Sequence, residues 1–371
     1  MTLRDKFRGC IAASWVGSAM GAAVEGWSPE RIAETYGVLE ELLPYRHYAG
    51  ETDWQRLPGT TEDGIERQKL LATAIIEKED RIQPQDLVAV WLRDLDPAKM
   101  VYKQEAFDRS LLEMARSGVP PVELGRLWPF YNQISMARAS HPVALINAGD
   151  PRGAADDALE VGQVYARSNA YSLRWAALYE AAIAEACRPG ATVASVLETA
   201  RGFIHYREEA GSLYTRYDTM EREVTRALEL AAKHSDPAAM RAEFYQHYEG
   251  GRHFVYSMSE AGEVVSKGLA VFAISEGDPR RAIVTAVNFG RDTDCLAAVA
   301  GGLAGALAGT ASIPAQWIAQ VNHATRHDPY TNNHRTIEET ADGLYAAYLA
   351  RRRRLGGYLK EMGTAGFLEE G

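Results

Sequence analysis

Two short acidic segments stand where apolar helical patterns begin. Residues 61–63 (Thr-Glu-Asp) precede the pattern GIERQKLLATAIIEKE, and residues 292–294 (Asp-Thr-Asp) precede CLAAVAGGLAGALAG. Carboxylate and hydroxyl oxygens are hard ligands that suit Mg²⁺, Mn²⁺ or Ca²⁺ better than zinc. If the two segments meet in one pocket, they predict a site for one or two such ions.

Helix capping is a simpler explanation for the same residues. An Asp at the N-cap accepts hydrogen bonds from the free N–H groups of the first turn, and acids in that turn also suit the helix dipole. Capping accounts for one acid at each helix better than for two. Buried carboxylates without partners are costly unless they are protonated or bound to a cation. From the residues alone, both explanations stay open.

The helix expected after the second acidic segment contains many small residues. They are Ala297, Ala298, Ala300, Gly301, Gly302, Ala304, Gly305, Ala306, Ala308 and Gly309. Each Gly costs about 1 kcal/mol of helix stability relative to Ala, so we expect a compensating close approach of neighbouring helices. The composition predicts that this helix runs through the centre of the protein and that its first turn forms the floor of a pocket.

Helical periodicity dominates the rest of the chain. Apolar residues recur three and four positions apart in residues 3–23, 64–79, 158–168, 172–188, 193–210, 220–234 and 336–354. The best strand candidate is the short stretch HFVYSM, residues 253–258. Pro and Gly mark the helix boundaries, and no stretch is long or biased enough to predict a linker. We therefore expect one all-α domain over residues 1–371.

The amino-acid composition indicates which kinds of partner and which cellular compartment to expect. The 371 residues are 46% hydrophobic and 24% charged, with a net charge of −10, so we expect neither nucleic acid nor a membrane surface as a partner. No apolar run reaches the roughly 18 residues of a membrane span. Three cysteines without a CxxC motif, and no apparent secretion signal, predict a cytoplasmic protein.

Three segments together resemble the ADP-ribosylglycohydrolase family. Its members carry an N-terminal G-D-x-x-G-x-x-x-E, then T-D-D-T, and near the C-terminus G-x-D-T-D followed by Thr or Ser and an Ala/Gly helix. In this chain residues 17–25 read GSAMGAAVE, residues 61–64 read TEDG, and residues 290–295 read GRDTDC. The order and spacing agree over nearly the whole chain.

The resemblance implies a compact orthogonal helical domain with a binuclear magnesium site. For this chain we expect one or two Mg²⁺ ions, with Mn²⁺ as an alternative. The implied activity is hydrolysis of an N- or O-glycosidic bond of an ADP-ribosyl or related ribosyl substrate, which is a small molecule or an ADP-ribosylated partner. The implied metal ligands are Thr61, Glu62, Asp63, Asp292 and Asp294. The implied catalytic residues are Glu25, Glu62 and Asp63.

Four residues are expected to contact the substrate. Tyr48 and Trp54 belong to a polar, aromatic loop of about residues 40–60 that suits a base or sugar, although plain packing explains the loop equally well. Arg138 matches an arginine of the family pattern. Asn332 lies in a segment expected at the pocket rim. The oligomeric state is not predicted.

The chain departs from the family pattern around the expected site. Ser18 and Glu62 each replace Asp, Gly64 replaces Thr, and Cys295 replaces a hydroxyl residue. A thiol is a poor ligand for Mg²⁺. Two alternatives therefore stay open. One is a hydrolase of a different N-glycoside or nucleoside-type molecule, and the other is a catalytically inactive, ligand-binding descendant of the family.

Overall fold

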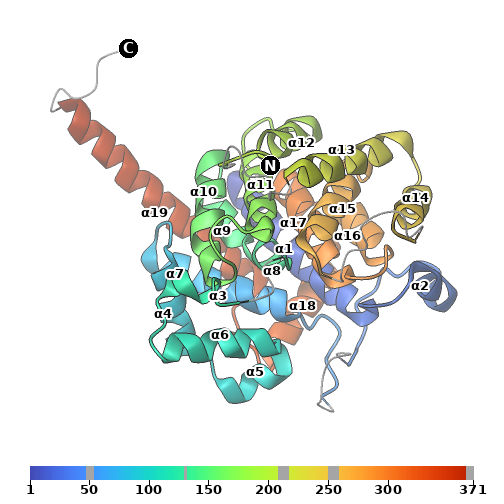
Figure 1. The fold of residues 1–371 in the computed structure, drawn as a ribbon, viewed down its shortest axis with the longest axis horizontal. Coiled ribbons are helices and arrows are strands. Elements are labelled where there is room, and N and C mark those ends of the chain that lie inside the picture. Colours follow the sequence, from blue (N-terminus) through green and yellow to red (C-terminus); the bar gives the residue numbers. More distant parts are fainter. Residues whose placement is uncertain (47–53, 129–131, 208–216, 250–258, 365–371) are drawn as a thin grey trace.

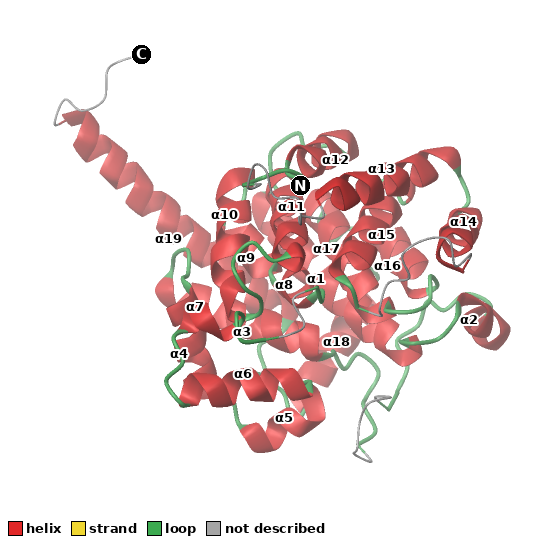
Figure 2. Cartoon of the chain, in the orientation of Figure 1, coloured by secondary structure: helices red, strands yellow, loops and turns green. Residues whose placement is uncertain are grey.

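A computed structural model describes residues 1–46, 54–128, 132–207, 217–249 and 259–364 (Figure 1). These residues form helices and no β-strand, which confirms the all-α prediction (Figure 2). In chain order the helices, with η for 3-10 helices, are α1 (Leu3–Gly21), η1 (Ala22–Val24), α2 (Pro29–Tyr36), α3 (Asp63–Lys78), α4 (Pro84–Asp94), α5 (Pro97–Lys103), α6 (Ala106–Arg116), α7 (Pro121–Leu124), α8 (Ser135–Ala139), α9 (His141–Ile146), α10 (Pro151–Val161), η2 (Gly162–Val164), α11 (Tyr171–Ala186), α12 (Val193–Gly202), α13 (Tyr217–Lys233), α14 (Pro237–Glu249), α15 (Ala261–Ile274), α16 (Pro279–Val287), α17 (Thr293–Ala308), α18 (Ala315–His327) and α19 (Ile337–Thr364).

Helices α1 and α17 form the centre of the fold. Gly9 and Gly305 lie so close together that a Cβ atom on either would overlap the backbone of the other helix. At the opposite end of the pair, Gly21 lies against Thr293, so the two helices run antiparallel. Residues 293–306 of α17 are all buried. The small residues thus provide the close approach that the sequence predicted.

The remaining helices surround this central pair. Helices α16 and α19 pack against α1, and α15 and α16 pack against α17 (Figure 1). Arg4 and Arg8 of α1 form ion pairs of 2.8 Å and 2.7 Å with Asp342 of α19. The first and last helices of the chain therefore lie side by side.

Some helix boundaries differ from the predicted ones. The pattern over residues 158–168 ends at Val164, and the pattern over residues 193–210 ends at Gly202, where glycine is a weak helix former. Beyond that point Arg207 has a φ of 52°, outside the helical region. The strand candidate, residues 253–258, lies outside the described residues. Within the described residues, no helix combines the length and hydropathy needed to cross a bilayer.

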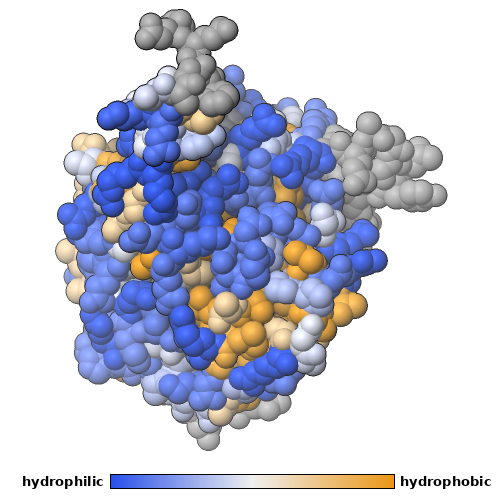
Figure 3. All heavy atoms as spheres, turned by 90° about the vertical axis from the view of Figure 1, so that its left-hand side faces the viewer, coloured by the Kyte–Doolittle hydropathy of each residue, from blue (hydrophilic) through white to orange (hydrophobic). Residues whose placement is uncertain are grey.

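The surface carries both hydrophilic and apolar side chains. The face in Figure 3, which is the left-hand side of Figure 1, is mostly hydrophilic with an apolar area. Helices α4 and α7 lie on that side, and they expose Leu92 and Val122. Helix α19 projects from the body and exposes Leu355 and Tyr358. Exposed apolar side chains are common on folded proteins.

Candidate metal and catalytic site

Backbone hydrogen bonds join the segment after α1 to the turn before α17. The N–H of Gly26 donates to the Arg291 carbonyl over 2.8 Å, and the N–H of Arg291 donates to the Trp27 carbonyl over 2.9 Å. Gly290 has a φ of 85°, and a Cβ atom there would contact the neighbouring Pro29. This turn therefore needs glycine. It fixes the chain around residue 25 near the start of α17.

Asp292 and Asp294 are buried at the first turn of α17. Their exposed fractions are 4% and 3%. Asp292 occupies the N-cap position, yet its side chain makes no capping hydrogen bond. Within the described residues, three of the four carboxylate oxygens lack a hydrogen-bond partner. They are both oxygens of Asp292 and Oδ1 of Asp294. Capping therefore does not explain Asp292.

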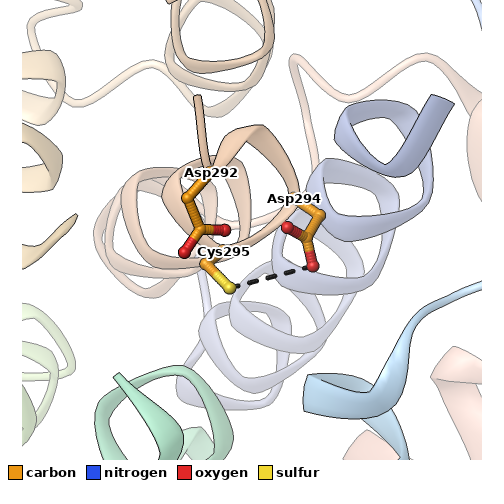
Figure 4. Close-up of side chains that lie close together, drawn as sticks. All are labelled: Asp292, Asp294 and Cys295. Atoms are coloured by element: carbon orange, nitrogen blue, oxygen red, sulfur yellow. Dashed lines mark hydrogen bonds between the residues drawn. The ribbon is translucent and has the colours of Figure 1, made fainter. Parts of the chain in front are cut away.

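The side chains of these two carboxylates lie close to the thiol of Cys295. In Figure 4 the side chains of Asp292, Asp294 and Cys295 point toward a common point. Each of the three offers a possible ligand atom, and these atoms lie within 4.8 Å of one another. The Sγ of Cys295 is 3.8 Å from Oδ2 of Asp294. The arrangement is compact enough for a single cation.

Electrostatic effects place Glu25 and the first acidic segment around the same space. Burial raises the pKa of Glu25 well above its usual value, and the charges of Asp292, Glu62 and Asp63 raise it further. Burial also raises the pKa of Asp294, with Glu25 and Asp292 adding to the effect. Charges influence each other in this way only at short range. The acids of both segments therefore lie near enough to influence one another.

Glu62 is buried but has cationic and polar neighbours. It occupies the N-cap position of α3 without a capping hydrogen bond, and its exposed fraction is 2%. The hydroxyl of Tyr45 donates to Oε1 of Glu62. The Nε of Arg56 lies 3.4 Å from the same oxygen. The carboxylate of Glu62 is thus balanced by the protein itself.

Asp63 is paired with two arginines. Its Oδ2 lies 2.8 Å from Nη2 of Arg67 and also accepts a hydrogen bond from Nη2 of Arg138. Arg67 in turn holds Asp108 with two hydrogen bonds of 2.9 Å and 2.7 Å. Asp63, Glu105 and Asp108 also lie close enough together to resemble a metal site. The two guanidinium groups already supply positive charge to this group of acids.

The two acidic segments therefore differ in how well they fit a divalent ion. Both oxygens of Asp292 and Oδ1 of Asp294 are buried without a hydrogen-bond partner in the described part of the chain, which suits a hard cation. Asp63 has an oxygen already used by two guanidinium groups. Cys295 offers sulfur where a hydroxyl oxygen was expected. The residues fit an ion on the α17 side, and they do not fit a second ion bound through Asp63 and Cys295.

The four residues expected to contact the substrate lie in different parts of the structure. Tyr48 lies outside the described residues. Trp54 is half-buried and packs edge-to-face on Tyr330, with ring centroids 4.8 Å apart. Asn332 donates its backbone N–H over 2.8 Å and its side-chain amide over 3.3 Å to Glu66 of α3. These two hydrogen bonds hold Asn332 against α3.

Arg138, the fourth of these residues, lies inside the acidic site. It belongs to α8, and its side chain is 8% exposed. Besides Asp63 it contacts Cys295, with Nη1 at 2.9 Å from Sγ. It therefore bridges residues of the two acidic segments.

Sequence reasoning missed the cations that hold the first segment. The Nζ of Lys103 donates to the Thr61 carbonyl and lies 2.9 Å from Oδ2 of Asp328. Thr61 itself is 2% exposed. Arg56 is anchored by a 2.8 Å hydrogen bond from Nη2 to the Tyr102 carbonyl. Lys103 and Arg56 carry no local sequence signal, because only tertiary packing brings them to the site.

Comparison with known proteins gives a consistent result along the chain. The family model described as ADP-ribosylglycohydrolase matches residues 1–354. An uncharacterized protein of Archaeoglobus fulgidus is 24% identical over 357 residues, which cover 94% of this chain and 98% of that protein. The uncharacterized protein YegU of Escherichia coli strain K12 is 23% identical over 336 residues, or 87% of this chain and 94% of YegU.

A solved structure has a similar architecture. It is described as an "ADP-ribosylglycohydrolase-related protein complex" and superposes with a TM-score of 0.61 at 20% sequence identity. The match covers 93% of this chain and 99% of that chain. At this level of identity the likeness establishes a shared helical fold.

Proposed function

Because the chain belongs to the ADP-ribosylglycohydrolase family, we propose that it is a divalent-metal-dependent hydrolase of ADP-ribosyl or related ribosyl substrates. The bond cleaved is an N- or O-glycosidic bond at the ribose. The observation that carries the proposal is the pair Asp292 and Asp294, in which both oxygens of Asp292 and Oδ1 of Asp294 are buried without a hydrogen-bond partner among the described residues. Mg²⁺, or alternatively Mn²⁺, is the expected ion.

Asp292 and Asp294 would hold the ion. When bound, the ion would supply Lewis acidity toward oxygens of the substrate. Negative charge on Asp292 and Asp294 beside the ribose would also favour the oxocarbenium-like transition state of glycoside cleavage, as it does in enzymes with paired carboxylates.

Glu25 is the proposed general acid. Its raised pKa means that it keeps its proton at higher pH than an exposed glutamate does. A carboxylic acid held neutral in this way can protonate the oxygen or nitrogen of the leaving group.

Glu62 is the proposed general base toward the attacking water, with Asp63 as the less favoured candidate. Arg67 and Arg138 both contact Oδ2 of Asp63, so this oxygen is already engaged. Glu62 has a weaker contact with Arg56 at 3.4 Å. We propose that Thr61 and Asp63 mainly shape the first segment.

We propose that Trp54 and Tyr48 contact the substrate, which is a small molecule or an ADP-ribosylated partner. Trp54 carries the Arg56 guanidinium 4.7 Å from its ring centroid, next to the acidic site. A cytoplasmic location is also proposed, because Cys10, Cys187 and Cys295 are buried free thiols that suit a reducing compartment.

A substrate screen tests the proposed function. The purified protein is incubated with ADP-ribosyl-arginine, ADP-ribosyl-serine, other ADP-ribose conjugates and nucleosides, with Mg²⁺ or with EDTA. We expect release of an ADP-ribosyl or ribosyl product with Mg²⁺ only. Glu25→Gln should lose turnover while it keeps Mn²⁺ binding, because Glu25 acts on the leaving group. Turnover that persists fully in EDTA, or in Glu25→Gln, would reject this mechanism.

A ligand-binding role without catalysis is the second candidate. The arginine partners of Glu62 and Asp63 favour it, because guanidinium groups already occupy carboxylate oxygens that a catalytic base would need free. Calorimetric titration with ADP-ribose distinguishes the two roles. Tight binding of ADP-ribose with no turnover of any conjugate in the screen would favour the binding role.

A further inference from the structure

Arg138 spans the space between the two acidic segments. One end of its guanidinium, Nη2, contacts Asp63 and lies 3.8 Å from Oε2 of Glu105. The other end, Nη1, is 2.9 Å from Sγ of Cys295 and 4.0 Å from Oδ2 of Asp294. A positive charge that belongs to the protein therefore already lies between α3 and α17.

Gly64 makes room for this arginine. A Cβ atom added at Gly64 would lie 2.9 Å from Cδ and 3.1 Å from Nε of Arg138, which is closer than van der Waals contact. Arg138 cannot easily move aside, because its guanidinium is held at both ends. The family pattern has Thr here, whose side chain is larger than a single Cβ. Gly64 and the observed position of Arg138 therefore belong together.

Cys295 is a second departure from the family pattern, and it meets the same side chain. A hydroxyl at this position would offer an oxygen to a hard ion, whereas the thiol is a weak ligand for Mg²⁺. The Sγ of Cys295 instead lies within hydrogen-bonding distance of Nη1 of Arg138. Two substitutions far apart in the sequence, at Gly64 and Cys295, thus both adapt the site to one guanidinium group.

The carboxylates divide into two sets around Arg138. The Oδ2 of Asp63 accepts hydrogen bonds from Arg138 and lies 2.8 Å from Arg67. On the α17 side, both oxygens of Asp292 lack partners within the described part of the chain, and Asp292 is 4% exposed. An ion placed at Asp63 would face two like charges, but an ion placed at Asp292 would meet orphaned oxygens.

We propose that Arg138 is a built-in cation that takes the place of one of the two divalent ions implied by the family resemblance. The centre then binds a single ion, on the side of Asp292 and Asp294. This inference rests on the divalent-ion chemistry of the proposed function and specifies how many ions that chemistry uses. Arg138 is accordingly a positioning residue for the acids and not a substrate ligand.

Manganese binding to the wild-type protein is the primary test. Equilibrium dialysis measures bound Mn²⁺ per chain, and electron paramagnetic resonance distinguishes an isolated ion from an exchange-coupled pair. We expect one Mn²⁺ per chain with the spectrum of an isolated ion. Neither readout depends on turnover.

Variants at Arg138 test its role directly. The combined variant Gly64→Thr, Cys295→Thr and Arg138→Ala restores the family residues and removes the guanidinium group, so it should bind a second, exchange-coupled Mn²⁺. Arg138→Lys keeps a positive charge and should still bind one ion. The control Arg126→Ala removes a guanidinium from a side chain that is 70% exposed, and should leave the count unchanged.

The outcomes separate this inference from the proposed function. Two coupled ions in the wild-type protein would overturn the role of Arg138 and leave a metal-dependent hydrolase intact. No bound ion in the wild-type protein would overturn both. If the combined variant fails to fold, the number of Mn²⁺ ions bound per chain by the wild type and by Arg138→Lys still tests the inference. A second bound ion in either protein would contradict it.

Discussion

Buried acids of this protein fall into those with a cationic partner and those without one. Asp63 has Arg67 and Arg138, and Glu62 has Arg56. Asp292 has no hydrogen-bond partner within the described residues. Leaving a buried carboxylate unpaired costs free energy unless it is protonated or binds a cation. Asp292 is therefore the residue at which metal binding and folding stability are most directly linked.

Asp292→Asn should weaken Mn²⁺ binding by more than about 100-fold, because even residues that only support a metal ligand contribute about 10–100-fold. In EDTA the same variant should unfold at a higher temperature than the wild type, because it removes a buried charge. Calorimetric titration and thermal melting measure the two effects.

Asp342→Asn is the matched control for this substitution. Asp342 is paired with Arg4 and Arg8 at the junction of α1 and α19, away from the acidic site. Its loss should leave Mn²⁺ affinity unchanged. Equal weakening of Mn²⁺ binding in both variants would contradict the assignment of Asp292 as a ligand.

His141 gives the protein a pH-dependent stability term separate from the metal site. Its ring is fully buried between Gln68, with Nδ1 at 3.1 Å, and Tyr179, with Nε2 at 2.8 Å. Burial lowers its pKa from 6.5 to about 4. The folded protein therefore holds this ring neutral in conditions where the unfolded chain would protonate it.

The free energy of unfolding should be independent of the protonation of His141 above about pH 6.5. It should decrease as the pH falls from there toward about 4, because the unfolded chain binds a proton that the folded protein does not. The linkage corresponds to roughly 2 kcal/mol between about pH 7.5 and pH 5. Urea unfolding at both pH values measures it. His141→Gln, which cannot titrate, should lose roughly 2 kcal/mol less than the wild type on acidification. Identical losses in the two proteins would reject this role.

At the scale of the elements, the contact between α1 and α17 determines the geometry of the site. The two helices approach through glycines, and Oγ1 of Thr293 donates to the Gly21 carbonyl over 2.8 Å. This hydrogen bond fixes the first turn of α17, which carries Asp292 and Asp294, against the end of α1. A change in the helix spacing would therefore move the acids as well.

Gly305→Ala should destabilise the protein by about 3 kcal/mol or more. Overpacking typically costs about 1–3 kcal/mol, and here the new Cβ would overlap backbone at Gly9 that cannot move like a flexible side chain. Gly356→Ala is the control. Gly356 lies in the exposed part of α19 with no atom near its added Cβ, so the change should be neutral or stabilise by up to about 1 kcal/mol. Denaturant unfolding compares the variants, and similar values for both would contradict the close packing.

The central helices could be predicted from the sequence, because their pattern of apolar and small residues lies within each helix. The small residues of α17 predicted the close packing of α1 and α17. Arg67 could have been found, since it lies four residues after Asp63 on one helix face. Arg138 could not be assigned to Asp63 in this way, because only the packing of α8 against α3 brings them together.

At the scale of the whole molecule, we propose that the chain is one domain and unfolds as one unit. The central pair joins helices from the two ends of the sequence, and α3, α11 and α15 pack around it. Calorimetry in EDTA should give a single transition whose calorimetric and van't Hoff enthalpies agree. Two resolved transitions would contradict a single domain.

The pairing of the first helix with α17 also affects how the protein is made. On the ribosome, α1 emerges long before its partner is synthesised. At typical elongation rates the delay is on the order of tens of seconds. Throughout that time the apolar surface of α1, including Phe7, Ile11 and Trp15, lacks its final covering. Biogenesis of this protein should therefore depend on chaperones that shield a nascent N-terminal helix.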